Sequence, residues 1–118
     1  MNSIVAAVDD LMFSSRIAAT AKQMGIDLSI ARSSDELLSQ ARALKPGLII
    51  FDLNATRLDP IGAITALKAD DALRGIMTLG FVSHVDSASI AAARAAGIDE
   101  VLARSAFSAR LAEILTTG

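Results

Sequence analysis

The sequence predicts an α/β protein in which one parallel sheet carries helices on both faces. Short apolar runs that end in polar residues alternate along the chain with stretches whose apolar residues recur at helical spacing. Such alternation is typical of parallel sheets, because the helices form the crossovers between neighbouring strands. At 118 residues the chain has the length of one domain, so we expect a single domain over residues 1–118.

The strands are expected from apolar runs. Residues 48–51 form the clearest strand, because they are apolar on both faces, as a central parallel strand must be when helices cover both sides. Residues 27–31 alternate polar and apolar side chains, so this strand is expected to be exposed on one face. In chain order the expected strands cover residues 4–8, 27–31, 48–51, 76–82 and 100–103.

The first two helices are recognised by a stop signal and a start signal. Apolar residues recur at helical spacing from Met12 to Met24, and Gly25 ends this helix. Ser33 and Glu36 have the spacing of a capping box, which starts the second helix. The expected buried residues are Phe13, Ile17, Ala21 and Met24 in the first helix and Leu37, Leu38, Ala41 and Leu44 in the second.

Three more helices complete the pattern. Asp59-Pro60 is an N-cap followed by a first-turn proline. Asp86 or Ser87 caps a fourth helix, and Ser105 or Ser108 is expected to cap the last one. The internal methionines expected to fill gaps in the core are Met12, Met24 and Met77.

Composition and charge exclude several classes of protein. An apolar content of 53 % excludes an intrinsically disordered chain, and the absence of cysteine excludes disulfides and thiolate metal centres. A net charge of −2 with 3 % aromatic residues argues against nucleic-acid binding. No apolar run is long enough for a membrane helix, and the N-terminus lacks the basic start of a signal peptide, so we expect a cytoplasmic protein without a membrane partner.

Polar residues follow the expected strands. Five strand–helix units without a long insertion favour the flavodoxin-like strand order 2-1-3-4-5, in which ligands bind outside the carboxyl ends of the strands, near the switch between strands 1 and 3. Three carboxylates, a hydroxyl group and a cation are expected to converge there. They belong to Asp9 and Asp10 after the first strand, Asp52 after the third, Ser83 after the fourth and Arg104 after the fifth.

Three neighbouring carboxylates repel one another unless a cation compensates their charge. Mg²⁺ suits this position, because it takes oxygen ligands and commonly binds one or two carboxylates together with phosphate oxygens. Taken alone, Asp9 or Asp10 is better explained as a helix N-cap or a solvated loop residue, whereas the set at one sheet edge favours a site. Asp52 is harder to explain in this way, since it ends the most buried strand. We therefore predict a cation site.

At these positions the whole chain resembles the response-regulator receiver domains of two-component signalling. In that family an acidic pair after the first strand binds Mg²⁺, and Asp9 and Asp10 match it. An aspartate after the third strand is a metal ligand and accepts a phosphoryl group from a phosphohistidine, and Asp52 matches it. The resemblance implies that Asn54 gives its backbone carbonyl to the metal and that Ser83 senses the phosphoryl group.

The resemblance also implies partners. The phosphoryl donor would be a sensor histidine kinase or a histidine phosphotransfer protein. A downstream protein, or a second copy in a homodimer, would bind the face made by the fourth helix, the fifth strand and the fifth helix, where Arg94, Arg104 and Arg110 would form a small basic patch. The domain would be a phosphoacceptor and no enzyme beyond its own aspartyl phosphorylation and dephosphorylation.

The sequence departs from the family pattern at several positions. The usual strand-5 lysine is replaced by Arg104, or by Ser105 if the alignment shifts by one residue. Arginine keeps the charge but is bulkier and planar. Ala55-Thr56 replaces the usual Met-Pro, Val101 stands where a switch aromatic is usual, and His84 takes the place of a small residue.

These departures leave two functions open. The retained acids favour a receiver that is phosphorylated on Asp52, whereas the missing lysine and switch ring favour a pseudo-receiver, an interaction module that phosphorylation does not switch. Residues 52–56 also resemble the Asp-x-Asp-x-Thr motif of haloacid-dehalogenase-type phosphatases. There the second acid is replaced by Asn54 and the chain has no room for a cap domain, so this third reading is not favoured.

Overall fold

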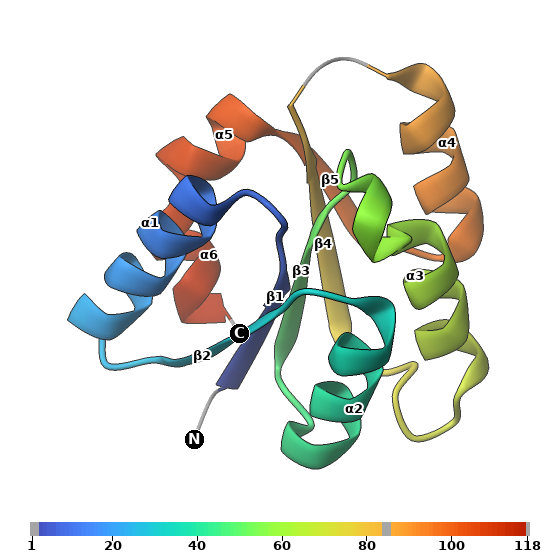
Figure 1. Cartoon of the computed structure of the whole chain (residues 1–118), viewed down its shortest axis with the longest axis horizontal. Coiled ribbons are helices and arrows are strands. Elements are labelled where there is room, and N and C mark those ends of the chain that lie inside the picture. Colours follow the sequence, from blue (N-terminus) through green and yellow to red (C-terminus); the bar gives the residue numbers. More distant parts are fainter. Residues whose placement is uncertain (1–2, 84–85, 118) are drawn as a thin grey trace.

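Five parallel strands form one sheet in the order β2-β1-β3-β4-β5 (Figure 1). The computed structural model describes residues 3–83 and 86–117, so that His84 lies outside the described residues. The α/β class and the predicted flavodoxin-like order are confirmed. The strands are β1 (Ser3–Ala7), β2 (Asp27–Ala31), β3 (Leu48–Asp52), β4 (Met77–Val82) and β5 (Glu100–Ala103).

Helices cover both faces of the sheet. In Figure 1, α1, α5 and α6 lie on one side of the sheet and α2, α3 and α4 on the other. The helices are α1 (Leu11–Gln23), α2 (Ser34–Leu44), α3 (Pro60–Ala69), α4 (Ser87–Ala96), α5 (Arg104–Ala109) and α6 (Leu111–Thr117), and a short 3₁₀ turn, η1 (Thr56–Leu58), precedes α3. No helix within the described ranges is long and apolar enough to cross a membrane.

The central strand β3 is enclosed on both faces. Its side chains alternate between two cores, with Ile49 and Phe51 packed under α2 and α3 and with Leu48 and Ile50 packed under α1 and α6. All four are at most 1 % exposed. This two-sided burial is why the strand reads as a continuous apolar run, and it fixes the backbone from which the site residue Asp52 projects.

Residues that were predicted to start helices cap them through side-chain hydrogen bonds. The Ser33 hydroxyl accepts a hydrogen bond from the Glu36 N–H at 3.1 Å, and the Asp59 carboxylate accepts one from the Gly62 N–H at 3.2 Å. Of the two residues proposed to cap α4, the structure selects Asp86. Gly25 has a φ of +71°, a conformation that suits glycine just past the end of a helix.

The prediction for the last helix is wrong. The chain enters α5 directly from β5, so that Ser105 and Ser108 lie inside the helix and neither one caps it. Ala103 occupies the N-cap position without a side-chain hydrogen bond. The segment also divides at Arg110, whose backbone leaves helical geometry, so the single expected helix is two short ones, α5 and α6.

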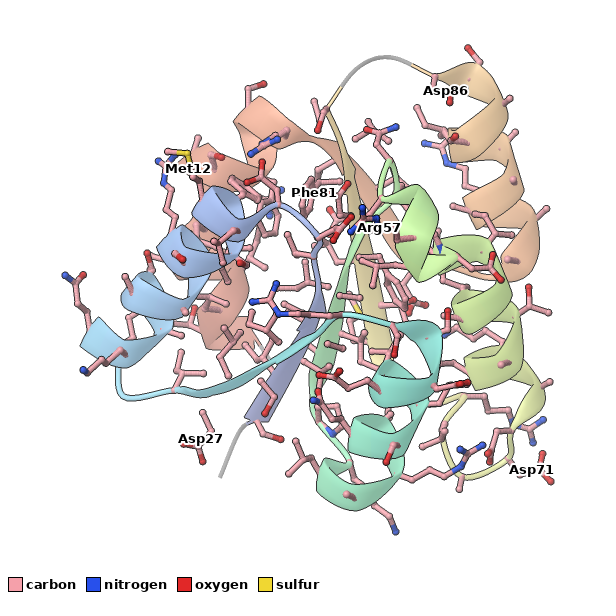
Figure 2. All side chains as sticks on the ribbon, viewed as in Figure 1. Met12, Asp27, Arg57, Asp71, Phe81 and Asp86 are labelled. Atoms are coloured by element: carbon pink, nitrogen blue, oxygen red, sulfur yellow. The ribbon has the colours of Figure 1, made fainter. Side chains whose placement is uncertain are left out.

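Two of the three methionines expected in the core are exposed. Met12 is 84 % exposed and points away from the sheet (Figure 2), because it lies one residue before Phe13 and therefore about 100° around the helix from the buried stripe. Met77 is 48 % exposed at the first residue of β4. Met24 packs partly buried against the core, as expected.

Gly80 lets the central sheet close tightly under the loop that follows β3. A Cβ atom at Gly80 would lie 2.8 Å from Cδ1 of Leu53 and 2.8 Å from Cδ1 of Ile98. Leu53 directly follows Asp52, and its N–H donates to the Phe81 carbonyl at 3.0 Å. The missing side chain at Gly80 thus allows Leu53 to hold the start of the loop that carries the site.

We expect Gly80→Ala to lower the free energy of unfolding by about 1–3 kcal/mol, since the added methyl group overpacks the core. Urea unfolding measures the change. Gly75→Ala is the matched control, because a Cβ at Gly75 meets nothing within 4 Å. Equal stability of the two variants would contradict the close packing at Gly80.

Candidate functional site

The predicted polar residues meet at the carboxyl edge of the sheet. In Figure 1 this edge lies where β1, β3 and β4 run into the connections toward α1, α3 and α4. Direct contacts join Asp10 after β1, Asn54 after β3, Ser83 after β4 and Arg104 at the start of α5. Asp52 ends β3 in the middle of this group, as the parallel order of the strands requires.

Asp52 is a buried carboxylate. Only 7 % of the residue is exposed, and its Oδ1 accepts a hydrogen bond from the Asn54 N–H at 3.1 Å. Burial raises the pKa of Asp52 more than the Asn54 N–H and the Arg104 charge lower it, and the carboxylates of Asp10 and Asp9 add to the rise. Arg104, Asp10 and Asp9 therefore all lie close enough to Asp52 to affect its pKa.

Asn54 joins the loop after β3 to the end of β4. Its side-chain Oδ1 accepts a hydrogen bond from the Ser83 N–H at 2.6 Å. The sequence predicted only a role for the Asn54 backbone carbonyl, and nothing in the spacing of the two residues indicates this contact. It holds Ser83 beside the phosphoacceptor candidate Asp52.

Asp10 both caps α1 and forms an ion pair in the site. It is the N-cap of α1, where its Oδ1 accepts a hydrogen bond from the Phe13 N–H at 3.1 Å. Its Oδ2 pairs with Nη2 of Arg104 at 3.1 Å. The hydrogen bond from Phe13 and the pairing with Arg104 lower the pKa of Asp10. The two readings left open for this residue, helix cap and site carboxylate, therefore describe one geometry.

Arg104 is the cation of the site. Its guanidinium donates through Nη1 to the Ser83 hydroxyl at 3.3 Å and through Nη2 to Asp10. It therefore connects the ends of β1 and β4, and Ser105, the alternative at this position, has no such contacts in the described part of the chain. The guanidinium carbon also lies 4.0 Å from the centroid of the Phe13 ring.

Two of the three arginines predicted to form a basic patch, Arg104 and Arg110, pair with acidic residues. Arg104 turns inward to the site, and Arg110 pairs with Glu100 at 3.9 Å and with Glu113 at 3.5 Å. Position 101, where a switch ring was considered, carries a partly buried valine within β5. Two of the three arginines predicted for the α4–β5–α5 face are therefore paired with acids.

The donor types suit a hard divalent cation. Carboxylate and carbonyl oxygens are the ligands that Mg²⁺ prefers, and it needs only one or two carboxylates. In the ranges that the structure describes, no three acidic or imidazole side chains are grouped closely enough to hold an ion by themselves. An ion bound by this set would therefore take part of its coordination from water or phosphate oxygens.

Three phenylalanines, of which Phe13 lies beneath Arg104, were not assigned to the site from sequence. The ring centroids of Phe13 and Phe81 lie 5.0 Å apart, those of Phe81 and Phe107 4.8 Å apart, and those of Phe13 and Phe107 5.8 Å apart. These residues come from α1, β4 and α5, so only the tertiary fold brings them together. We call the three rings the aromatic cluster.

We expect Asp52→Asn to raise the free energy of unfolding at neutral pH by roughly 1 kcal/mol, because it removes a buried charge and keeps an acceptor for the Asn54 N–H. The raised pKa means that ionised Asp52 destabilises the folded state above its folded pKa. The gain should disappear as the pH falls below 3.8, the ordinary value for Asp, where both states are protonated.

Urea unfolding at several pH values measures this gain. Asp27→Asn is the control, since Asp27 is an exposed carboxylate at the start of β2, away from the site (Figure 2). An Asp52→Asn variant that is less stable than the parent protein at pH 7 would show that the buried charge is fully compensated.

The chain resembles known proteins in its structure. No family model and no curated protein matches the sequence. Among solved structures, the chemotaxis response regulator CheY4 of Vibrio cholerae is 17 % identical with a TM-score of 0.84, and the match covers 98 % of this chain and 97 % of that one.

Two further structures are similar over nearly the whole chain. The phosphorylated cyanobacterial phytochrome response regulator RcpA is 19 % identical, with a TM-score of 0.80 and coverage of 97 % of this chain and 88 % of that one. The Mn²⁺-bound response regulator Rcp1 is 17 % identical, with a TM-score of 0.78 and coverage of 98 % and 89 %. The chain therefore has the fold of response-regulator receiver domains.

Proposed function

We propose that residues 1–118 form a single receiver-like domain that accepts a phosphoryl group on Asp52 and regulates by protein–protein contact. The observation that carries this proposal is the buried Asp52 carboxylate at the end of the central strand, with one cation, Arg104, acting on it. A structural Asp at this position would be costly without a function, because a buried carboxylate needs compensation. The similarity to phosphorylated RcpA supports the same reading.

The proposed reaction transfers a phosphoryl group from a phosphohistidine. An oxygen of Asp52 attacks phosphorus, a new P–O bond forms, the P–N bond breaks and the neutral imidazole leaves after taking up a proton. Arg104 would balance the charge on the phosphoryl oxygens, and the Ser83 hydroxyl, which accepts a hydrogen bond from Arg104, would donate its own to one of them.

A divalent cation, Mg²⁺ in this proposal, would bind among Asp9, Asp10, Asp52 and the carbonyl of Asn54 and would supply further charge neutralisation. Because the three carboxylates are not grouped closely enough to hold an ion by themselves, water or phosphate oxygens would complete its coordination. The similar protein Rcp1 binds Mn²⁺, which supports the binding of a divalent ion by a domain of this fold. Both oxygens of Asp10 already have partners in the protein, namely the Phe13 N–H and Arg104. Asp10 would therefore share its charge between Arg104 and the ion.

The proposed donor is a sensor histidine kinase or a histidine phosphotransfer protein. The proposed output surface is the α4–β5–α5 face, which would bind a downstream protein or a second copy of the chain. Paired charges such as Arg110 with Glu100 would make this contact depend on charge complementarity.

A pseudo-receiver that phosphorylation does not switch is the second candidate. It is favoured by the absence of a ring on β5, where Val101 is a partly buried aliphatic residue, and by the engagement of Arg104 with Asp10 and Ser83. In this case the same fold would act through its surface alone.

Incubation with acetyl phosphate and Mg²⁺ separates the two candidates. We expect intact-mass measurement to show one added phosphoryl group on the parent protein and none on Asp52→Asn, because that variant lacks the nucleophile. Asp27→Asn, which changes an exposed carboxylate away from the site, should be modified like the parent protein. An unmodified parent protein that also fails to bind Mg²⁺ would leave the pseudo-receiver as the function.

A further inference from the structure

Phe13 contacts both members of the ion pair between Asp10 and Arg104. Its backbone N–H donates to Oδ1 of Asp10 at 3.1 Å, while Oδ2 of the same carboxylate binds Arg104 at 3.1 Å. Its ring lies beneath the Arg104 guanidinium, with 4.0 Å from the guanidinium carbon to the ring centroid. One residue of α1 therefore fixes the carboxylate from one side and the cation from the other.

The ring of Phe13 is itself held in place. The residue is only 4 % exposed, and its ring meets Phe81 edge-on and Phe107 at a tilt within the aromatic cluster. Phe81 lies on β4 two residues before Ser83, and Phe107 lies three residues after Arg104. The surface beneath the guanidinium is thus built from the same elements that supply the partners of Arg104.

The guanidinium of Arg104 makes three contacts at once. Its carbon lies over the Phe13 ring while its N–H groups reach Asp10 and Ser83. A ring attracts a cation through its negative face, so the contact with Phe13 also favours the charge. An ammonium group is a compact point charge without the fork of N–H groups, and it would keep the charge but not this set of contacts.

We propose that Phe13 is a positioning residue, which holds Arg104 at the place where its charge acts on Asp52. The proposal rests on the proposed function for its kinetic consequence, but the position of Arg104 can be measured independently. If the Phe13 ring is removed, Arg104 keeps its charge and its hydrogen bonds to Asp10 and Ser83, but its guanidinium samples a wider range of positions.

The first test is spectroscopic and needs no phosphorylation. The face of an aromatic ring shifts the NMR signals of protons above it, so the side-chain signals of Arg104 should be ring-shifted in the parent protein. They are identified as the arginine signals absent from Arg104→Lys. Phe13→Leu should return them to ordinary values, whereas Phe51→Leu should not, because Phe51 is a buried ring in the core on the opposite face of the sheet.

The second test is kinetic, at a temperature where circular dichroism shows every variant folded. Phe13→Leu should slow the modification of Asp52 by acetyl phosphate about threefold relative to Phe51→Leu, the size expected when one exposed cation–ring contact is lost. Arg104→Lys should also be slower than the parent protein, although it keeps the positive charge.

The outcomes are distinct. Unshifted Arg104 signals in the parent protein, or signals that stay shifted in Phe13→Leu, overturn the positioning role. Equal rates for Phe13→Leu and Phe51→Leu overturn it as well. If the parent protein is not modified at all, the proposed function fails, while ring-shifted Arg104 signals that depend on Phe13 still support the positioning role.

Discussion

The burial of one carboxylate at the end of an enclosed strand is the constraint on which the rest of the site depends. Helices on both faces of β3 remove water from its sides, so Asp52 loses most of its solvation at the one position where the strand opens. A hydrogen bond from the Asn54 N–H and the charge of Arg104 partly compensate for this lost solvation. The effect of burial is the largest, so the pKa of Asp52 remains above its ordinary value.

The neighbours of Asp52 are coupled through Arg104. This one guanidinium touches Asp10, Ser83 and the ring of Phe13, so a change at the end of β1 or β4 alters the position of the charge that faces Asp52. The aromatic cluster gives the contact a rigid base, since its rings come from elements on which these residues are also placed. At this end of the sheet, the position of the polar groups therefore depends on the packing of the core.

A helix end could be predicted from the sequence where the residues that cause it lie only a few positions away. Ser33, Asp59 and Gly25 act on backbone atoms a few residues away, and the helix ends that they predict are present. The last helix was misplaced because β5 leads into α5 without a loop, a property of the sheet edge that Ser105 does not encode. Met12 was misplaced because it was assigned to the core by its hydrophobicity, although it lies off the helical stripe that contains Phe13 and Ile17.

The sequence by itself determined the strand order, the burial of β3 on both faces and the set of charged residues at its carboxyl edge. These features follow from the spacing of apolar residues and from the polar residues that end each strand, which can be identified from neighbouring positions in the chain. Only the tertiary structure decided which of these groups touch. Asn54 and Ser83 are 29 residues apart, and Asp10 and Arg104 are 94 apart, so their contacts depend on parallel strands closing side by side. The ring beneath Arg104 has the same origin, since Phe13 looks like an ordinary core residue until α1 is packed against β4 and α5.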